Sequence, residues 1–280
     1  MRDRVETVVH EMTGELSGER QRVLHVATKS VSFHALQVLM KYPGSGPDGS
    51  WERTGSTSDS LDDALAAGVL RDRHVFELRS LTREDTSYRE GAGPRTKWGR
   101  SQSATQYATG VTSHSTAGHG GFKLSAGRNA KVHPALREAG GWYEEDSDWA
   151  VVAHTFPELF TTYERDVADK SLRNWKPDEY TQATGIEVTP EESSTLRDRA
   201  FASENAGNYV VLSAVYSSDH PGMTEVNATL GGKRPSYGED WNDRKFLVPS
   251  AEYSAVPLGK FVVDLERHEE MLPASPSPGR

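Results

Sequence analysis

The pattern of hydrophobic and polar positions along the first ninety residues predicts short helices and short strands. Apolar residues at positions 5, 8, 9 and 12 follow helical spacing and predict an amphipathic helix over residues 1–16. The pattern then predicts strands at 23–28 and 33–42 (the second also compatible with a helix), a loop at 43–59, a helix at 61–70 capped by Ser60, and a strand at 74–81. Residues 1–90 are therefore expected to form a β-rich N-terminal region.

The rest of the chain is expected to hold an α+β domain over residues 97–270. Residues 105–125 predict short strands joined by glycine turns, and the sequence up to about 185 predicts helices broken at Gly140-Gly141 and at prolines. Thr189 followed by Pro190 predicts the start of a helix over 189–205. Strand-like runs follow at 209–216, 223–230, 245–249 and 260–265, and residues 271–280 are expected to be a disordered tail.

These elements fall in blocks rather than in strict alternation. Blocks of strands and helices favour the α+β class over a doubly wound parallel sheet. We therefore expect antiparallel β segments at both ends of the chain, around a central, mostly helical region that is punctuated by glycine.

Composition excludes several classes of protein. The 280 residues include no cysteine, which rules out disulfides, iron–sulfur clusters, thiolate zinc sites and cysteine nucleophiles. No apolar run approaches the roughly 20 residues that span a bilayer, and the N-terminal residues lack the apolar core of a signal peptide. The sequence therefore predicts a soluble, cytoplasmic protein with no membrane partner, and we expect neither a metal nor a cofactor.

Charge is unevenly distributed along the chain. The net charge is −9, which argues against a protein that coats DNA. However, residues 91–137 carry seven Lys or Arg and no acid, whereas residues 138–171 carry nine acids against two basic residues. The two blocks either neutralise each other across a folded core or place anion-binding groups next to carboxylates, and both descriptions can hold together.

A carboxylate occupies an apolar position of the helix expected after Gly140-Gly141. Positions 142, 149, 152 and 156 are apolar and share one face at spacings of seven, three and four, and Glu145 occupies the missing step. Desolvation on such a face favours the protonated carboxyl near neutral pH, as a general acid requires. Asp146 beside it is the second candidate. Alternatively, these acids only stabilise the N-terminus of the helix.

A glycine-rich segment supplies a candidate proton donor or acceptor. Gly118, Gly120 and Gly121 surround His119, so the backbone there can approach a ligand closely. Histidine exchanges a proton near neutral pH. Lys123 and other nearby cations suit an anion such as phosphate, although the P-loop pattern GxxxxGK[ST] and the pattern GxGxxG are both absent from this segment. The alternative is an ordinary glycine-rich hairpin with a solvated histidine.

Four segments together resemble an uncharacterised domain family of bacterial plasmids and phages. They are WGRSQ (98–102), STAGHGGFKLS (115–125), GGWYEEDSDWAVVAHTFPE (140–158) and LRNWKPDEYTQATG (172–185). The resemblance covers about residues 97–185, is most specific in STAGHGG and GWYEED, and implies a mobile-element setting without an activity that can be transferred. His114 and His154 stand where relatives of this family are expected to have apolar residues, so both are set aside as site members.

These observations favour an enzyme that acts on a nucleotide or a DNA base. The specific hypothesis is a glycosylase-like hydrolase that cleaves an N-glycosidic bond, with Glu145, Asp146 and His119 as catalytic groups. Phosphate would be bound by Arg100, Lys123 and Arg128, and the base by Trp98, Trp142 or Tyr143, with Gln102, Gly120 and Gly121 lining the same site.

Two other functions remain open. The mobile-element resemblance favours a non-enzymatic inhibitor of host restriction or defence, which would bind a defence protein or sequester a signalling nucleotide. A DNA-binding accessory of replication or transfer ranks last, because the net charge of −9 opposes it.

Overall fold

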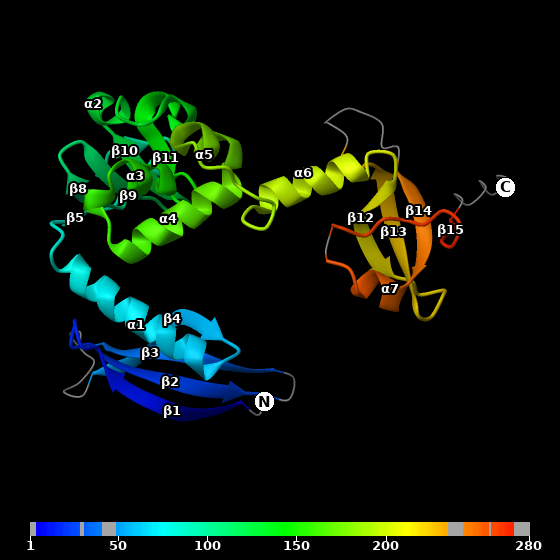
Figure 1. Cartoon of the computed structure of the whole chain (residues 1–280), viewed down its shortest axis with the longest axis horizontal. Coiled ribbons are helices and arrows are strands. Elements are labelled where there is room, and N and C mark those ends of the chain that lie inside the picture. Colours follow the sequence, from blue (N-terminus) through cyan, green and yellow to red (C-terminus); the bar gives the residue numbers. More distant parts are fainter. Residues whose placement is uncertain (1–3, 29–30, 41–48, 235–242, 258, 272–280) are drawn as a thin grey trace. The chain divides into compact units, whose positions relative to one another are not determined.

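The computed structural model describes residues 4–28, 31–40, 49–234, 243–257 and 259–271 (Figure 1). The chain divides into two compact units, Met1–Val188 and Thr189–Arg280. Antiparallel sheets lie in the N-terminal and C-terminal parts, and most helices lie between them, so the predicted α+β class is confirmed. The expected tail beyond residue 271 lies outside the described residues.

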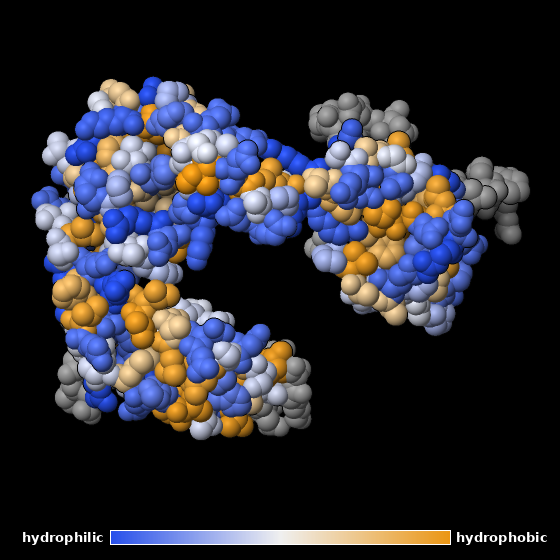
Figure 2. Space-filling model, viewed as in Figure 1, coloured by the Kyte–Doolittle hydropathy of each residue, from blue (hydrophilic) through white to orange (hydrophobic). Residues whose placement is uncertain are grey.

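The first unit opens with a four-stranded antiparallel sheet in chain order. Its strands are β1 (Val5–Thr13), β2 (Arg20–Ala27), β3 (Ser32–Met40) and β4 (Ser50–Ser58). Helix α1 (Leu61–Leu78) begins after Ser60, whose side chain accepts from the amide of Asp63, and packs Ala64 against Val23 and Leu36. Apolar residues also lie on the surface of this region (Figure 2).

Three of the expectations for this region are wrong. Residues 5–13 form a strand rather than a helix, because β-branched residues favour extended backbone and β2 satisfies their backbone groups. Residues 50–58 of the expected loop form β4, which pairs with β3, while 41–48 lie outside the described residues. A strand was expected at 74–81, but residues 74–78 form the C-terminal end of α1.

A buried carboxylate ties α1 to the turn between β1 and β2. Asp72 accepts hydrogen bonds from the Leu16 amide (2.9 Å), the Ser17 amide (2.8 Å) and the Ser17 hydroxyl (2.5 Å). Burial raises the pKa of Asp72, but these hydrogen bonds outweigh it and hold the pKa below its ordinary value. The ionised side chain therefore stabilises the folded state.

Replacing Asp72 with alanine is expected to lower the free energy of unfolding by about 3 kcal/mol at pH 7, because three hydrogen bonds to a charged acceptor are lost. Since the folded-state pKa lies below 3.8, this contribution is complete above that pH and disappears as pH falls through the folded-state pKa. Urea denaturation at pH 7 and pH 3 measures both effects. The exposed Asp62 of the same helix is the control, and an equal loss in Asp62→Ala would contradict the prediction.

A second sheet forms the centre of the first unit. Its order is β11-β10-β9-β8-β5, and its strands are β5 (Glu84–Ser87), β8 (Ser103–Ala108), β9 (Val111–Ser115), β10 (Gly120–Leu124) and β11 (Trp142–Glu144). One face buries Phe122 and Tyr143 in the helical core. The main helices of that core are α3 (Trp149–Thr155), α4 (Thr162–Trp175) and α5 (Pro177–Thr184), and the short α2 (Ala126–Asn129) follows β10.

The helix expected over residues 142–156 does not exist as one element. Residues 142–144 pair with β10 as a strand, and the helix begins only at Trp149. The Glu144 carboxylate accepts from the amides of Asp146 (2.7 Å) and Ser147 (3.4 Å) and so closes the turn between the two. The apolar residues at 142 and 149 therefore belong to different elements, and the expected common face is absent.

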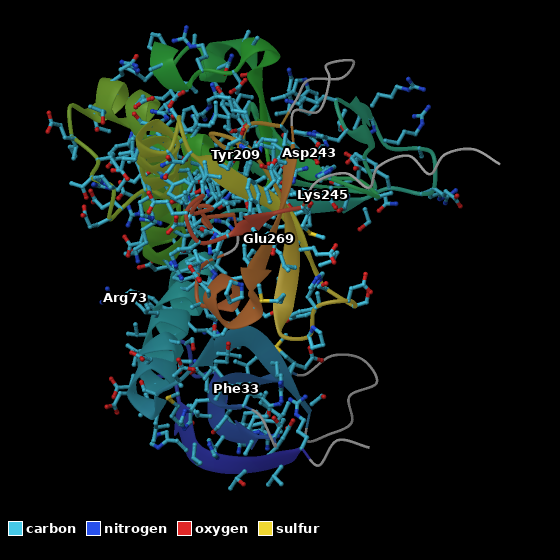
Figure 3. The ribbon with its side chains drawn as sticks, turned by 90° about the vertical axis from the view of Figure 1, so that its right-hand side faces the viewer. Phe33, Arg73, Tyr209, Asp243, Lys245 and Glu269 are labelled. Carbon is cyan, nitrogen blue, oxygen red and sulfur yellow. The ribbon has the colours of Figure 1, made fainter. Side chains whose placement is uncertain are left out.

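In its described residues, the second unit is a smaller antiparallel sheet with two helices. The elements are α6 (Ser194–Glu204), β12 (Tyr209–Tyr216), β13 (Met223–Leu230), β14 (Arg244–Pro249), α7 (Ser250–Ser254) and β15 (Glu269–Glu270). Tyr209 and Lys245, both labelled in Figure 3, belong to β12 and β14, the two strands that flank β13. The expected strand at 260–265 makes only an isolated bridge from Val262 to β12, and Ser193 rather than Thr189 caps α6.

Within the described ranges, no helix combines the length and the apolar character that crossing a bilayer requires.

Candidate functional site

The face of the central sheet that points away from the helical core carries the candidate site. On β10, Gly121 pairs with His114 of β9 on one side and with Glu144 of β11 on the other. Directly paired residues project to the same face of a sheet. His114 and Glu144 therefore flank a position without a side chain, and we call His114, Gly121 and Glu144 the glycine row.

Trp98 covers the middle of the glycine row. It belongs to a tight hairpin between β6 (Arg95–Thr96) and β7 (Gly99–Arg100), where the Thr96 hydroxyl accepts from the Trp98 amide (3.1 Å). A Cβ on Gly121 would overlap the Trp98 ring. Trp98 also meets the edge of Trp142, with ring centroids 5.6 Å apart. Glycine at position 121 is therefore what allows the indole to lie against the sheet.

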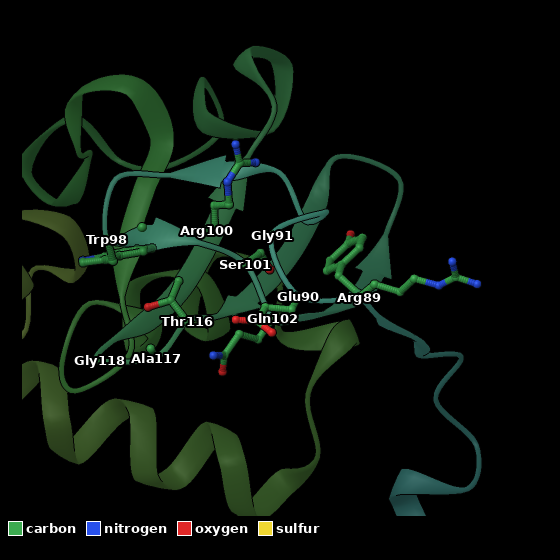
Figure 4. A pocket seen from close by; sticks show the side chains of 12 residues that line it. Arg89, Glu90, Gly91, Trp98, Arg100, Ser101, Gln102, Thr116, Ala117 and Gly118 are labelled. Atoms are coloured by element: carbon green, nitrogen blue, oxygen red, sulfur yellow. The ribbon is translucent and has the colours of Figure 1, made fainter.

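A pocket of about 610 Å³ opens beside Trp98 (Figure 4). Three chain segments line it, namely 88–91, 98–102 and 116–118. Trp98 lies at one side of the pocket and Arg89 at the other, with Thr116, Ala117 and Gly118 below them in this view. The pocket therefore has an aromatic ring at one side and is also lined by Arg89, Arg100 and the acidic Glu90, with both guanidinium groups directed outward in this view.

A histidine and two carboxylates lie at the end of the glycine row. His119, Glu144 and Asp146 each place one nitrogen or oxygen within 4.8 Å of the others. Oε1 of Glu144 is buried without a hydrogen-bond partner in the described part of the chain and lies 3.8 Å from Nδ1 of His119. We call these three residues the His119 cluster. Such a cluster can share a proton or ligate a divalent cation.

The turn between β9 and β10 joins the pocket to the His119 cluster. Thr116 and Gly118 line the pocket, and His119 follows directly. The Thr116 hydroxyl accepts from the His119 amide (3.2 Å) and donates to the His119 carbonyl (2.5 Å). The position of the His119 imidazole therefore depends on a turn whose residues 116–118 line the pocket.

The structure separates the two glutamates that the sequence places together. Because side chains alternate along a strand, Glu144 shares the face of Trp98 and His114, whereas Glu145 projects to the other side. The Glu145 amide donates to the Gly120 carbonyl (3.2 Å), and its side chain is exposed beside Gly120. The buried helical face that suggested Glu145 as a catalytic acid is absent, and the carboxylate on the site face is Glu144.

The three cations expected to bind one anion do not converge. Each donates to a backbone carbonyl instead: Arg100 to Gly93 (3.1 Å), Lys123 to Gly140 and Arg128 to Thr109 (3.2 Å). Of the three, Arg100 lines the pocket beside Trp98, whereas Lys123 lines a separate pocket of about 430 Å³. Lys123 also lies 4.7 Å from the Trp142 ring centroid. Part of the basic block therefore stabilises loops.

The remaining expected residues divide between the site and the core. Gln102 lines the pocket, and Trp142 lies on the site face. Gly120 is buried beside Glu145. Tyr143 is fully buried, with its hydroxyl donating to Asn129 (2.6 Å), so it cannot stack on a ligand. Burial also raises the pKa of Tyr143.

Three residues of the site were missed at the level of sequence. His114 was set aside on the family resemblance, but β9 places it in the glycine row. Arg89 lies two positions before the basic block and is separated from it by Glu90. Glu144 belongs to the GWYEED string, and a strand pairing of Trp142 with Lys123 would have placed it on the correct face. No signal in the sequence gives that pairing.

Comparisons identify the central region without assigning an activity. Residues 91–206 match the family described as "Domain of unknown function (DUF7007)". This confirms that an uncharacterised family covers the glycine-rich segment and the GWYEED string. The chain matches no curated protein, and it matches no solved structure either.

Proposed function

We propose that the pocket beside Trp98 binds a nucleotide, free or within a nucleic acid, and that the His119 cluster hydrolyses its N-glycosidic bond. One observation supports this most strongly: an aromatic wall and cationic side chains line a pocket that shares a turn with a histidine–carboxylate cluster. An aromatic ring stacks on any base, and guanidinium groups bind phosphate. The pocket has an aromatic ring and two guanidinium groups, and the acid–base groups of the His119 cluster lie beside it.

The reaction divides its tasks among these residues. Trp98 stacks on the base, while Arg89 and Arg100 bind the phosphate. Water attacks the anomeric carbon as the bond to the base breaks, and the leaving base nitrogen takes a proton from the His119 cluster. The Glu144 carboxylate stabilises the positive charge that develops on the sugar. The proton of the attacking water passes to solvent, and the products are the free base and either the sugar phosphate or, within a nucleic acid, an abasic site.

Charge and the family resemblance limit the substrate and the setting. A chain of net charge −9 with a local basic segment suits a small nucleotide or one exposed nucleotide better than a long duplex. Action on duplex DNA would require the base to be flipped out of the stack. We place the reaction in a cytoplasmic, mobile-element setting.

The test is mass spectrometry of products. The full chain is incubated with a panel of ribonucleotides and deoxyribonucleotides and with modified and unmodified single- and double-stranded DNA. Release of a free base supports the proposal. A nucleotide recovered bound but unchanged would replace it with a sequestering inhibitor of host defence, which uses the same pocket without turnover. Neither binding nor release would leave a protein-binding role instead.

Trp98→Ala is expected to weaken nucleotide binding by about 10-fold or more, since one base–aromatic stack contributes roughly 1–3 kcal/mol. Isothermal titration calorimetry with 5′-AMP measures the change in dissociation constant. Trp175→Ala is the matched control, because that indole is 58% exposed at the end of α4. Equal affinities of wild type and Trp98→Ala would show that the indole does not contact the base.

A further inference from the structure

The imidazole of His114 has a fixed tautomer. Its Nδ1 lies 3.1 Å from the hydroxyl oxygen of Ser101. That hydroxyl has a single proton, which it donates to the Ser103 carbonyl (2.7 Å). The Ser101 oxygen can therefore only accept from His114, so Nδ1 carries a proton.

The other ring nitrogen of His114 is consequently a hydrogen-bond acceptor. Burial lowers the pKa of His114, so the ring is neutral at pH 7 and Nε2 carries a lone pair. Nε2 has no hydrogen-bond partner among the residues that the structure describes. A half-buried acceptor that is oriented through Nδ1 and otherwise unused is typical of a general base.

His114 also lies next to the candidate site. Ser101, its partner, is buried and lines the pocket beside Trp98. Within the glycine row, His114 and Glu144 stand on opposite sides of Gly121, and the Trp98 ring lies over that glycine. His114 does not itself line the pocket but is joined to it through Ser101, on the same face of the sheet as Glu144.

We propose that Nε2 of His114 is the hydrogen-bond acceptor of this site and takes the proton of the attacking water. This inference rests on the proposed function. In the balanced step, the water oxygen bonds to the anomeric carbon and the electron pair of the C1′–N bond leaves with the base. The His119 cluster protonates that base, His114 takes the water proton, and both groups then exchange protons with solvent.

Nuclear magnetic resonance of the full chain, labelled with ¹⁵N, tests the acceptor without requiring turnover. We expect the Nδ1–H tautomer of His114 in the free protein and a shift of its Nε2 resonance when 5′-AMP is added. The Trp98 indole signal reports binding independently. An Nε2–H tautomer, or a Trp98 shift without an Nε2 shift, overturns the inference. If neither signal moves, the proposed function fails and the role of His114 fails with it.

Two substitutions of His114 separate binding from proton transfer. Glutamine reaches the position of Nε2 but is not a base, so His114→Gln should lower kcat by about 100-fold and change KM by less than about threefold. Asparagine reaches only the Nδ1 position, so His114→Asn should lower kcat equally and also raise KM by about 10-fold. His10→Asn, on the exposed β1 strand, is the control. Unchanged kcat in His114→Asn overturns the inference.

Discussion

Glu144→Gln should lower the rate of base release by about 1,000-fold while leaving the fold intact, within the range that acid–base groups contribute. Glutamine keeps one oxygen for the amides of Asp146 and Ser147, so the turn after β11 can persist. What it removes is the negative charge opposite Nδ1 of His119, because the buried Oε1 becomes an amide nitrogen. Single-turnover kinetics with the substrate found by mass spectrometry measures the loss.

The matched control for this substitution is Glu158→Gln, which removes one negative charge from an exposed position of the same unit. It should release base at the wild-type rate. Circular dichroism should give the same melting temperature for wild type and Glu144→Gln to within a few degrees. Wild-type activity in Glu144→Gln would show that Glu144 takes no part in the reaction and would leave Asp146 and Glu145 as the candidate carboxylates.

Gly121→Ala is expected to cost about 4 kcal/mol of folding free energy, by combining backbone strain with overpacking. Gly121 has a φ of +150°, which residues with a side chain rarely adopt. An added Cβ would overlap the carbonyl oxygen of Tyr143 on the neighbouring strand and the Trp98 ring. The backbone contact cannot be relieved without separating β10 from β11, so both the sheet and the glycine row are disrupted.

Urea denaturation followed by tryptophan fluorescence measures this cost. Gly118→Ala provides the comparison, because a Cβ there meets no atom within 4 Å. It should change the free energy of unfolding by less than about 1 kcal/mol. A Gly121→Ala protein as stable as wild type would mean that the strands adjust freely, and would contradict the close approach of Trp98.

The fold was predictable where side-chain pattern and backbone preference agree. The strands at 209–216 and 223–230 have the residues that the apolar runs predict, because Val, Tyr and Thr favour extended backbone. The pattern failed at residues 5–13, where apolar spacing matched a helix but the valines lie exposed on a strand. Pairing with β2 decided the conformation there, and no local pattern encodes that pairing.

The candidate site was predictable in location but not in detail. The glycine-rich segment and the GWYEED string do meet, since β10 pairs with β11. Which glutamate lies on the site face depends on strand alternation, and the sequence favoured a helix at that place. The carbonyl partners of Arg100, Lys123 and Arg128 come from loops that only the tertiary structure brings near. Charge counting could not separate these cations from ligand-binding ones.

The turn between β9 and β10 has a consequence for selectivity if the proposed function holds. The same few residues touch the pocket and carry His119, so a ligand that fills the pocket also contacts the turn on which the imidazole depends. Binding energy from the phosphate, which takes no part in bond breaking, is then spent on positioning a reacting group. A nucleotide and the nucleoside that lacks its phosphate would therefore differ more in kcat than in dissociation constant.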